Sequence, residues 1–206
     1  MRVGILGGTG DFGRALATRL GNAGYDVTIG SRDAARAEAT AQELRVQGAA
    51  NADVARQAEL VVLAVNADAA LQTAHSLARS IGSTPLLCVA SELRFADGAA
   101  RPGAPGRSLA ERVAEAVPGP VVAGLHSLAA RTLARDEPPD EDALVCGDDT
   151  DAKELALELA AELVAGRALD AGPLASARAL EGMTAVIVNL NRRYRGHAGI
   201  RVTGLR

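Results

Sequence analysis

The sequence has few aromatic side chains, so the hydrophobic core has to be built from other residues. Phe, Tyr and Trp together make up 2% of the 206 residues, and there is no Trp. Hydrophobic residues make up 48% and charged residues 23%, which is ordinary for a globular protein and argues against a disordered or collagen-like chain. A chain of this length buries enough surface to fold without disulfides or a structural metal. We therefore expect a core of Ala, Leu, Val and Ile.

Further absences narrow the class of protein. Cys88 and Cys146 are the only cysteines, too few for a disulfide framework or a zinc site of their own, and we expect them to be reduced and buried. No stretch approaches the roughly 20 apolar residues that span a bilayer, and the N-terminus lacks an apolar secretion signal. A formal charge of −3 without a basic block argues against a nucleic-acid partner. We expect a cytoplasmic protein that binds neither membranes nor nucleic acid.

Short aliphatic runs alternate with longer segments rich in Ala, Leu, Arg and Glu. This alternation is typical of βαβ units in a parallel sheet. Strands are predicted at residues 2–7, 26–30, 60–65, 85–90, 120–125, 143–146 and 167–171. Helices are predicted at residues 11–23, 33–47, 69–81, 108–117, 151–165 and 174–194. The predicted fold class is α/β: a Rossmann-type, doubly wound, mostly parallel sheet with a smaller C-terminal α/β extension that ends in a long helix.

Two segments interrupt the alternation. Residues 95–107 are rich in Gly, Pro and Ala and are predicted to form a surface loop. Residues 136–142 read DEPPDED and are predicted to form a solvated connector. A third group of acids, at Asp148, Asp149 and Asp151, precedes a predicted helix, so we interpret these residues as helix caps and not as metal ligands. No metal site is expected.

The strongest local motif is the glycine cluster GGTGDFG at residues 7–13, between the first predicted strand and the first predicted helix. Gly8, Gly10 and Gly13 satisfy the pattern GxGxxG, which permits a tight turn, a close approach of the backbone to a pyrophosphate, and close packing of helix on strand. The helix N-terminus then presents unpaired N–H groups to phosphates. Arg14 and Ala15 stand where a nucleoside-triphosphatase loop needs Lys and a hydroxyl, so that alternative is disfavoured.

The end of the second predicted strand indicates the type of dinucleotide. Enzymes that use NAD usually place an acid there to hold the ribose 2′-hydroxyl. Here the strand ends in Gly30-Ser31-Arg32, and Arg36 follows one helical turn later. Ser31 offers a hydroxyl and Arg32 a planar guanidinium suited to a 2′-phosphate, whereas Asp33 has the position of a helix cap. The sequence therefore favours NADP(H) over NAD(H).

Together with the glycine loop and the Ser-Arg turn, the C-terminal half resembles the NADPH-dependent coenzyme F420 reductases, also called F420:NADP oxidoreductases. The matching stretches include GLHSLAAR, VCGDDTDAKE and LDAGPLASARALEGMTAVIVNLN, and the resemblance covers nearly the full length. It implies NADP(H) as cofactor, coenzyme F420 as co-substrate, direct hydride transfer between the two, and a homodimer. It also implies an NADP(H)-binding Rossmann domain at residues 1–126, and a portion at 127–206 that completes the substrate site and forms the dimer interface.

The resemblance also implies the site residues. The predicted cofactor-binding residues are Gly8, Thr9, Gly10, Asp11, Phe12, Ser31, Arg32, Arg36, Val65, Asn66, Ala67 and Ala90. The predicted F420-side residues are His126, Ser127, Leu128, Arg178 and Thr184. Of these, His126 is the predicted catalytic residue, with an orienting or charge-stabilising role, because hydride transfer asks the protein mainly to stack two rings and exclude water.

Three departures from the family pattern fall on the substrate side. Residues 65–68 read VNAD where relatives carry Pro and an aromatic residue, residues 90–93 read ASEL where they carry a proline turn, and Gly182 replaces a hydroxyl residue. Two alternatives therefore stay open. The first is an NADPH-dependent reductase of another acceptor, such as an imine, a carbonyl or a flavin. The second is a non-catalytic NADP(H) sensor.

Overall fold

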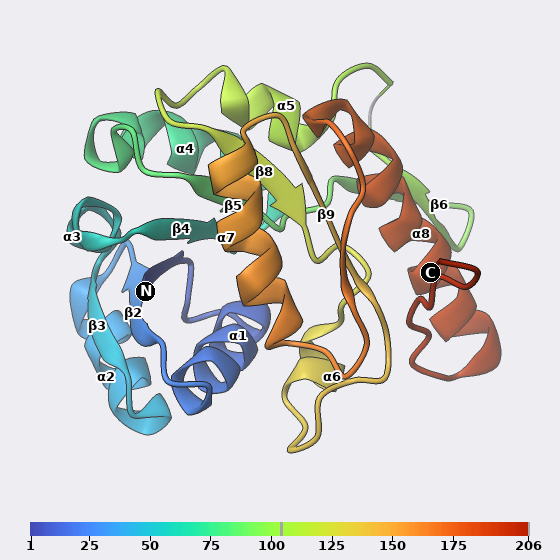
Figure 1. Cartoon of the computed structure of the whole chain (residues 1–206), viewed down its shortest axis with the longest axis horizontal. Coiled ribbons are helices and arrows are strands. Elements are labelled where there is room, and N and C mark those ends of the chain that lie inside the picture. Colours follow the sequence, from blue (N-terminus) through green and yellow to red (C-terminus); the bar gives the residue numbers. More distant parts are fainter. Residues whose placement is uncertain (104, 206) are drawn as a thin grey trace.

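An eight-stranded sheet crosses the molecule in the order β10-β9-β8-β5-β4-β1-β2-β3 (Figure 1). The computed structural model describes residues 1–103 and 105–205. The strands are β1 (Arg2–Leu6), β2 (Asp26–Ser31), β3 (Gln47–Ala50), β4 (Leu60–Leu63), β5 (Leu86–Cys88), β8 (Val121–Gly124), β9 (Ala143–Gly147) and β10 (Ala168–Asp170). Six of them, from β3 to β8 in this order, run parallel, whereas β9 is antiparallel to β8 and β10 is parallel to β9. The predicted mostly parallel Rossmann-type sheet is confirmed.

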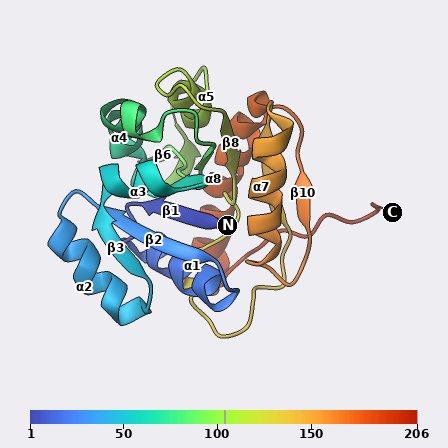
Figure 2. The same cartoon turned by 60° about the vertical axis from the view of Figure 1, so that its left-hand side comes forward.

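Helices cover both faces of the sheet. They are α1 (Asp11–Asn22), α2 (Ala34–Leu44), α3 (Asn51–Gln57), α4 (Ala67–Ile81), α5 (Leu109–Ala114), α6 (Ala130–Leu133), α7 (Thr150–Ala161) and α8 (Ala177–Tyr194), the last preceded by a 3-10 turn at Leu174–Ser176. Helices α3 and α4 lie on one side of β1 and α1 lies on the other (Figure 2). Successive strand residues serve opposite faces, so Val62 packs in the core with α1 and α7, while Val61 packs in the core with α4 and α5.

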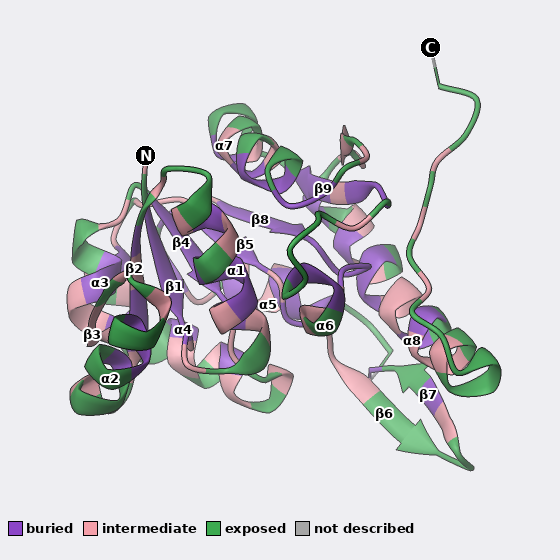
Figure 3. Ribbon diagram, turned by 90° about the horizontal axis from the view of Figure 1, so that it is seen from below, coloured by how far each residue is buried: buried purple, intermediate pink, exposed green. Residues whose placement is uncertain are grey.

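The buried strands and inner helix faces form the core, and the outer helix faces are exposed (Figure 3). No aromatic side chain is among the buried hydrophobic residues of the described ranges, so the prediction of an aliphatic core is confirmed there. Cys88 and Cys146 are free and buried, as predicted, and burial raises the pKa of each thiol to about 12. In the described part of the chain, no helix has the length and apolarity needed to cross a bilayer.

The C-terminal portion is joined directly to the nucleotide-binding half. Strands β9 and β10 extend the same sheet, and the guanidinium of Arg19 on α1 donates hydrogen bonds to the carbonyls of Leu133, Arg135 and Glu137 at 2.6 to 2.8 Å. Three carbonyls on one planar guanidinium orient the segment after α6 against α1. The predicted division at residues 126 and 127 thus falls between β8 and α6, within one continuous sheet.

The structure corrects the predicted end of one helix and one predicted surface loop. The predicted helix at residues 33–47 ends at Leu44, where Arg45 adopts a left-handed conformation, and the unpredicted β3 and α3 follow. The predicted surface loop at residues 95–107 contains most of a β-hairpin, β6 (Leu93–Ala96) and β7 (Ala99–Pro102), which projects beside α8 (Figure 3). Its turn is Asp97-Gly98, both with positive φ, which is a favoured two-residue hairpin turn.

The acidic segment at residues 136–142 is not fully solvated, so the prediction of a solvated connector is wrong for its last two residues. Glu141 and Asp142 are 4% and 0% exposed. The Asp142 carboxylate accepts hydrogen bonds from Arg167 and from the backbone N–H of Val202, and these bonds hold its pKa well below the usual range. The end of this segment is therefore the anchor of the C-terminal tail. By contrast, Asp33 and Asp149 cap α2 and α7 as predicted.

Candidate functional site

A pocket of about 560 Å³ opens at the carboxyl edge of the sheet, beside the glycine loop. It gathers predicted cofactor-binding residues from three segments that follow β1, β2 and β4. These residues are Thr9, Gly10, Ser31, Arg32, Arg36, Val65 and Asn66. Ligands of open α/β sheets bind at this edge, so the pocket has the position of a dinucleotide site.

The glycine loop has the geometry that a phosphate cradle needs. A Cβ atom at Gly8 would lie 2.5 Å from Cβ of Ile29, and one at Gly13 would lie 2.6 Å from Cα of Gly8, so neither position accepts a side chain. Gly7 has a φ of +77°. These three glycines let α1 begin directly against β1, with its first N–H groups at the pocket.

Gly8 itself is buried beneath the pocket. Its N–H donates to the carbonyls of Ile5 at 3.2 Å and Gly30 at 3.0 Å, so its hydrogen bonds serve the loop. Asp11 and Phe12 begin α1, and Phe12 packs against the core. Because the first turn of a helix leaves N–H groups unpaired, the backbone of α1 is the natural phosphate donor, not the side chains of these two residues.

Two exposed cations line the pocket beyond the end of β2, Arg32 directly after the strand and Arg36 in the first turn of α2. Among the residues that the structure describes, the side chains of Arg32 and Arg36 form no ion pair. Ser31 accepts a hydrogen bond from the N–H of Asp33, whose carboxylate accepts one from the N–H of Arg36. The acid that follows Arg32 is therefore occupied as a helix cap, and two guanidinium groups without an ion pair remain for an anionic ligand.

Asn51 is a pocket residue that the sequence analysis missed. It is the first residue of α3, it is 8% exposed, and its side-chain oxygen has no hydrogen-bond partner in the structure. Its oxygen lies where a side chain of Gly30 would otherwise be. A buried amide oxygen without a partner is costly unless a ligand or water satisfies it, so Asn51 fits a hydroxyl or amino group of a bound nucleotide. The α4 residues Gln72, Thr73 and Ser76, also unpredicted, form the opposite wall.

Five of the predicted cofactor-binding residues do not line this pocket: Gly8, Asp11 and Phe12, described above, and Ala67 and Ala90. Ala67 is the first residue of α4, and Ala90 is buried two residues after β5. Both still follow strands at the carboxyl edge, Ala67 after β4 and Ala90 after β5. Their predicted contact with a cofactor stays a prediction.

A second polar cluster follows β8 at the same edge of the sheet. His126 is 6% exposed, and neither of its ring nitrogens has a hydrogen-bond partner in the structure. The hydroxyl of Ser127 is also buried without a partner. Burial lowers the pKa of His126 to about 4, and the nearby backbone of Ala90 offsets only part of this effect. The imidazole is therefore neutral at physiological pH, with one donor and one acceptor unused.

The remaining predicted F420-side residues lie in different surroundings. Thr184 on α8 donates a hydrogen bond of 2.8 Å to the carbonyl of His126. Leu128 packs in the core with α1 and α7. Arg178, in the first turn of α8, is half-buried and lies about 240° around the helix axis from Thr184. The structure thus joins Thr184 to His126 and places Leu128 in the core.

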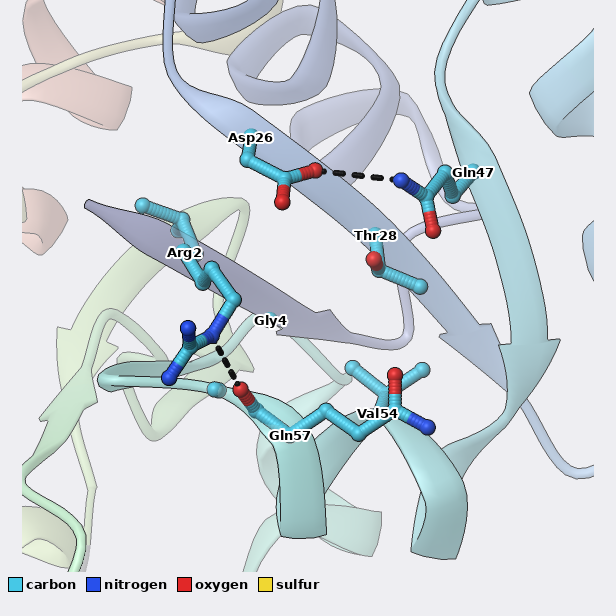
Figure 4. A pocket seen from close by; sticks show the side chains of 9 residues that line it. Arg2, Gly4, Asp26, Thr28, Gln47, Val54 and Gln57 are labelled. Carbon is cyan, nitrogen blue, oxygen red and sulfur yellow. Dashed lines mark hydrogen bonds between the residues drawn. The ribbon is translucent and has the colours of Figure 1, made fainter.

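A small hollow at the other end of the strands serves as a contrast (Figure 4). It holds about 30 Å³ and is lined by the first residues of β1 and β2 and by α3. Its polar groups are paired with each other: Arg2 donates to the carbonyl of Gln57 at 2.9 Å, and Gln47 donates to Asp26 at 3.1 Å. This volume suits a water molecule and no nucleotide.

The fold and the carboxyl-edge pocket define a Rossmann-type, dinucleotide-binding oxidoreductase. The chain belongs to the family of F420-dependent NADP reductases. The family model described as "NADP oxidoreductase coenzyme F420-dependent" matches residues 2–87. The F420-dependent NADP reductase of Methanothermobacter marburgensis is 37% identical over the whole of this chain and 99% of its own length. The reductase of Methanocaldococcus jannaschii is 31% identical over the same share of each chain.

Solved structures agree with this family. A putative F420-dependent NADP reductase from Arthrobacter sp. FB24 superposes with a TM-score of 0.85 and 28% identity, over 99% of this chain and 100% of that one. An imine reductase from Streptomyces aurantiacus has a TM-score of 0.64 at 23% identity, over 95% of this chain and 62% of that one. The second likeness is one of fold alone.

Proposed function

We propose that this protein transfers a hydride between NADP(H) and the deazaflavin coenzyme F420. The observation that carries the NADP(H) half is the pocket in which the glycine loop, Ser31 and two unpaired arginines converge. The F420 half rests on full-length identity to relatives that are named F420-dependent NADP reductases. Both predicted sites follow strands at the carboxyl edge of one sheet, which suits a direct transfer between two rings.

In this proposal, each part of the site has a binding or orienting task. The N-terminus of α1 holds the pyrophosphate, and Arg32 and Arg36 hold the 2′-phosphate. Asn51 accepts a hydrogen bond from the nucleoside. The chemistry of hydride transfer is supplied by the two cofactors when they are bound.

His126 has an orienting role in this proposal. Burial keeps its imidazole neutral, so a donor and an acceptor, and no permanent positive charge, face the reacting rings. Of the two roles that the sequence allowed, the neutral ring supports orientation over charge stabilisation. The neighbouring unpaired hydroxyl of Ser127 adds a second group that a bound ring would satisfy.

Turnover in a mixture of purified protein, NADPH and F420 tests the proposal directly. We expect the deazaflavin absorbance to fall as F420 is reduced, at a rate that depends on both NADPH and F420. Tight NADPH binding without turnover would favour a sensor. Turnover with imines, carbonyls or flavins but not with F420 would favour a reductase of another acceptor.

We also propose a homodimer formed through α8, in the cytoplasm. Val186, Leu190 and Tyr194 recur every four residues along this helix and are 57%, 40% and 72% exposed, and Phe95 of the hairpin is 61% exposed. Such a large exposed apolar stripe is typical of an interaction surface. The family resemblance supports a second copy of the chain as the partner.

Replacing Leu190 by glutamate is expected to convert the dimer to a monomer, because a carboxylate would be buried at the interface without a partner. Sedimentation velocity of the two proteins measures the change. Leu205→Glu is the control, because Leu205 is similarly exposed but lies outside α8. A wild-type protein that sediments as a monomer at micromolar concentration would refute the dimer.

A further inference from the structure

Three segments that are far apart in sequence meet through two hydroxyl groups at the carboxyl edge of the sheet. The Ser91 hydroxyl lies 2.8 Å from the Thr184 hydroxyl, and the Thr184 hydroxyl lies 2.8 Å from the carbonyl oxygen of His126. Ser91 follows β5, Thr184 lies in the middle of α8, and His126 follows β8. Ser91 and Thr184 are half-buried, so water competes only partly for these bonds.

The chemistry of the groups determines which one donates. A carbonyl oxygen has no proton, so Thr184 has to donate its single hydroxyl proton to His126. The proton between the two hydroxyls therefore comes from Ser91. The chain runs in one direction, from the Ser91 hydroxyl to the Thr184 hydroxyl and on to the His126 carbonyl, and each bond polarises the next.

This chain of hydrogen bonds ends on the backbone that carries the His126 ring. The backbone of Ala90, the residue before Ser91, lies close to the imidazole on one side. Leu125, the residue before His126, has a φ of +64°, an uncommon conformation for a non-glycine residue that the surroundings have to maintain. Neither ring nitrogen forms a well-aligned hydrogen bond in the structure, so the bond from Thr184 to the His126 carbonyl is a polar attachment that helps to fix the peptide from which the ring projects.

We propose that Ser91 is a positioning residue for hydride transfer, acting through Thr184 on the peptide of His126. The inference rests on the proposed function, and it adds a residue from the segment after β5, where the sequence departs from the family pattern. Loss of the Ser91 hydroxyl leaves Thr184 free to rotate and the His126 peptide less constrained. The imidazole then spends less time in the orientation that the acceptor ring requires.

The kinetic test compares Ser91→Ala, Thr184→Val and the double variant with the conservative Thr184→Ser. We expect kcat with F420 to fall about fivefold to tenfold in Ser91→Ala and in Thr184→Val, with the Kd for NADPH unchanged. The double variant should be no slower than Thr184→Val, because both residues act through one chain. Thr184→Ser should retain most of the rate, and Ser83→Ala, at an exposed serine beyond α4, should match the wild type.

Nuclear magnetic resonance of the histidine rings without F420 supplies a readout besides activity. The sequence has three histidines, and His75 and His197 are exposed. We expect Ser91→Ala and Thr184→Val to shift the ring signals of His126 and leave those of His75 and His197 in place. Unchanged His126 signals, or additive losses of rate in the double variant, would overturn the proposal. If the wild type does not turn over F420, the proposed function fails, and the ring signals still decide whether Ser91 positions His126.

Discussion

Replacing Arg32 by alanine is expected to lower kcat/KM for NADPH by tenfold to about 100-fold, while that for NADH changes less than about threefold. The guanidinium of Arg32 lines the pocket and forms no ion pair among the described residues, so the 2′-phosphate would be its first charged partner. NADH lacks that phosphate and gains nothing from the arginine. The measurement is a pair of initial-rate series, one with each nucleotide, at fixed F420 concentration.

The matched control is Arg79→Ala. Arg79 is also an exposed arginine, in the last turn of α4, and it does not line the pocket. The same loss of one positive charge there should leave both series unchanged, which separates a contact with the phosphate from a general effect of net charge. Equal losses with NADPH and NADH in Arg32→Ala would refute the assignment of Arg32 to the 2′-phosphate. The difference between the two nucleotides should also shrink at high salt, because the contact is partly exposed.

The parts of the site that the sequence predicted are those encoded within short stretches. The glycine loop needs Gly8 and Gly13 because backbone and side-chain atoms occupy the space of a Cβ, and this need is visible as a spacing. The turn with Ser31 and Arg32 follows a short strand in which Val27 and Ile29 alternate with polar residues, so its place at the sheet edge could be counted along the chain. Local geometry of this kind depends on few distant contacts.

Asn51 could not be found in this way, because the elements around it give weak signals. Strand β3 reads QGAA, without a β-branched or aromatic residue, and it pairs only at the edge of the sheet. Glycine is needed at position 48 because a Cβ atom there would lie 2.5 Å from the carbonyl oxygen of Ala37. This contact is set by how α2 packs on β3. The asparagine that follows enters the pocket through tertiary packing alone.

The hydrogen bonds that link Ser91 to His126 could not be predicted from the sequence either. Ser91 and Thr184 are 93 residues apart, and no spacing rule joins a loop residue to the middle of a distant helix. The buried end of the acidic segment is similar, since its partners Arg167 and Val202 are 25 and 60 residues away. A run such as DEPPDED is typical of solvent-exposed loops, so its burial is a property of the assembled fold.

That buried end leads to an expected dependence of stability on pH. Glu141 is 4% exposed, one of its carboxylate oxygens has no partner, and the backbone of Gly199 in the C-terminal tail packs against it. Burial raises the pKa of Glu141 to about 7, against 4.5 in its ordinary range, and the N–H of Ile200 offsets only part of this. Between these two pH values the folded protein holds a proton that the unfolded chain has released. The contribution of Glu141 to the free energy of unfolding therefore falls as the pH rises from 4.5 to 7, by about 3 kcal/mol, and does not change further above pH 7.

Glu141→Gln should remove this slope, because an amide of nearly the same size stays neutral throughout. Urea unfolding at pH 5 and pH 8 measures the difference, with Glu137→Gln, at an exposed position of the same segment, as the control. The neighbouring Asp142 stays ionised over this range, since its paired carboxylate has a pKa well below it. The three proteins differ only at these two positions, so the contributions of the rest of the chain cancel in the comparison. Parallel pH profiles for the wild type and Glu141→Gln would show that the carboxyl of Glu141 is hydrated in solution, and that the tail is held by the ion pairs of Asp142 instead.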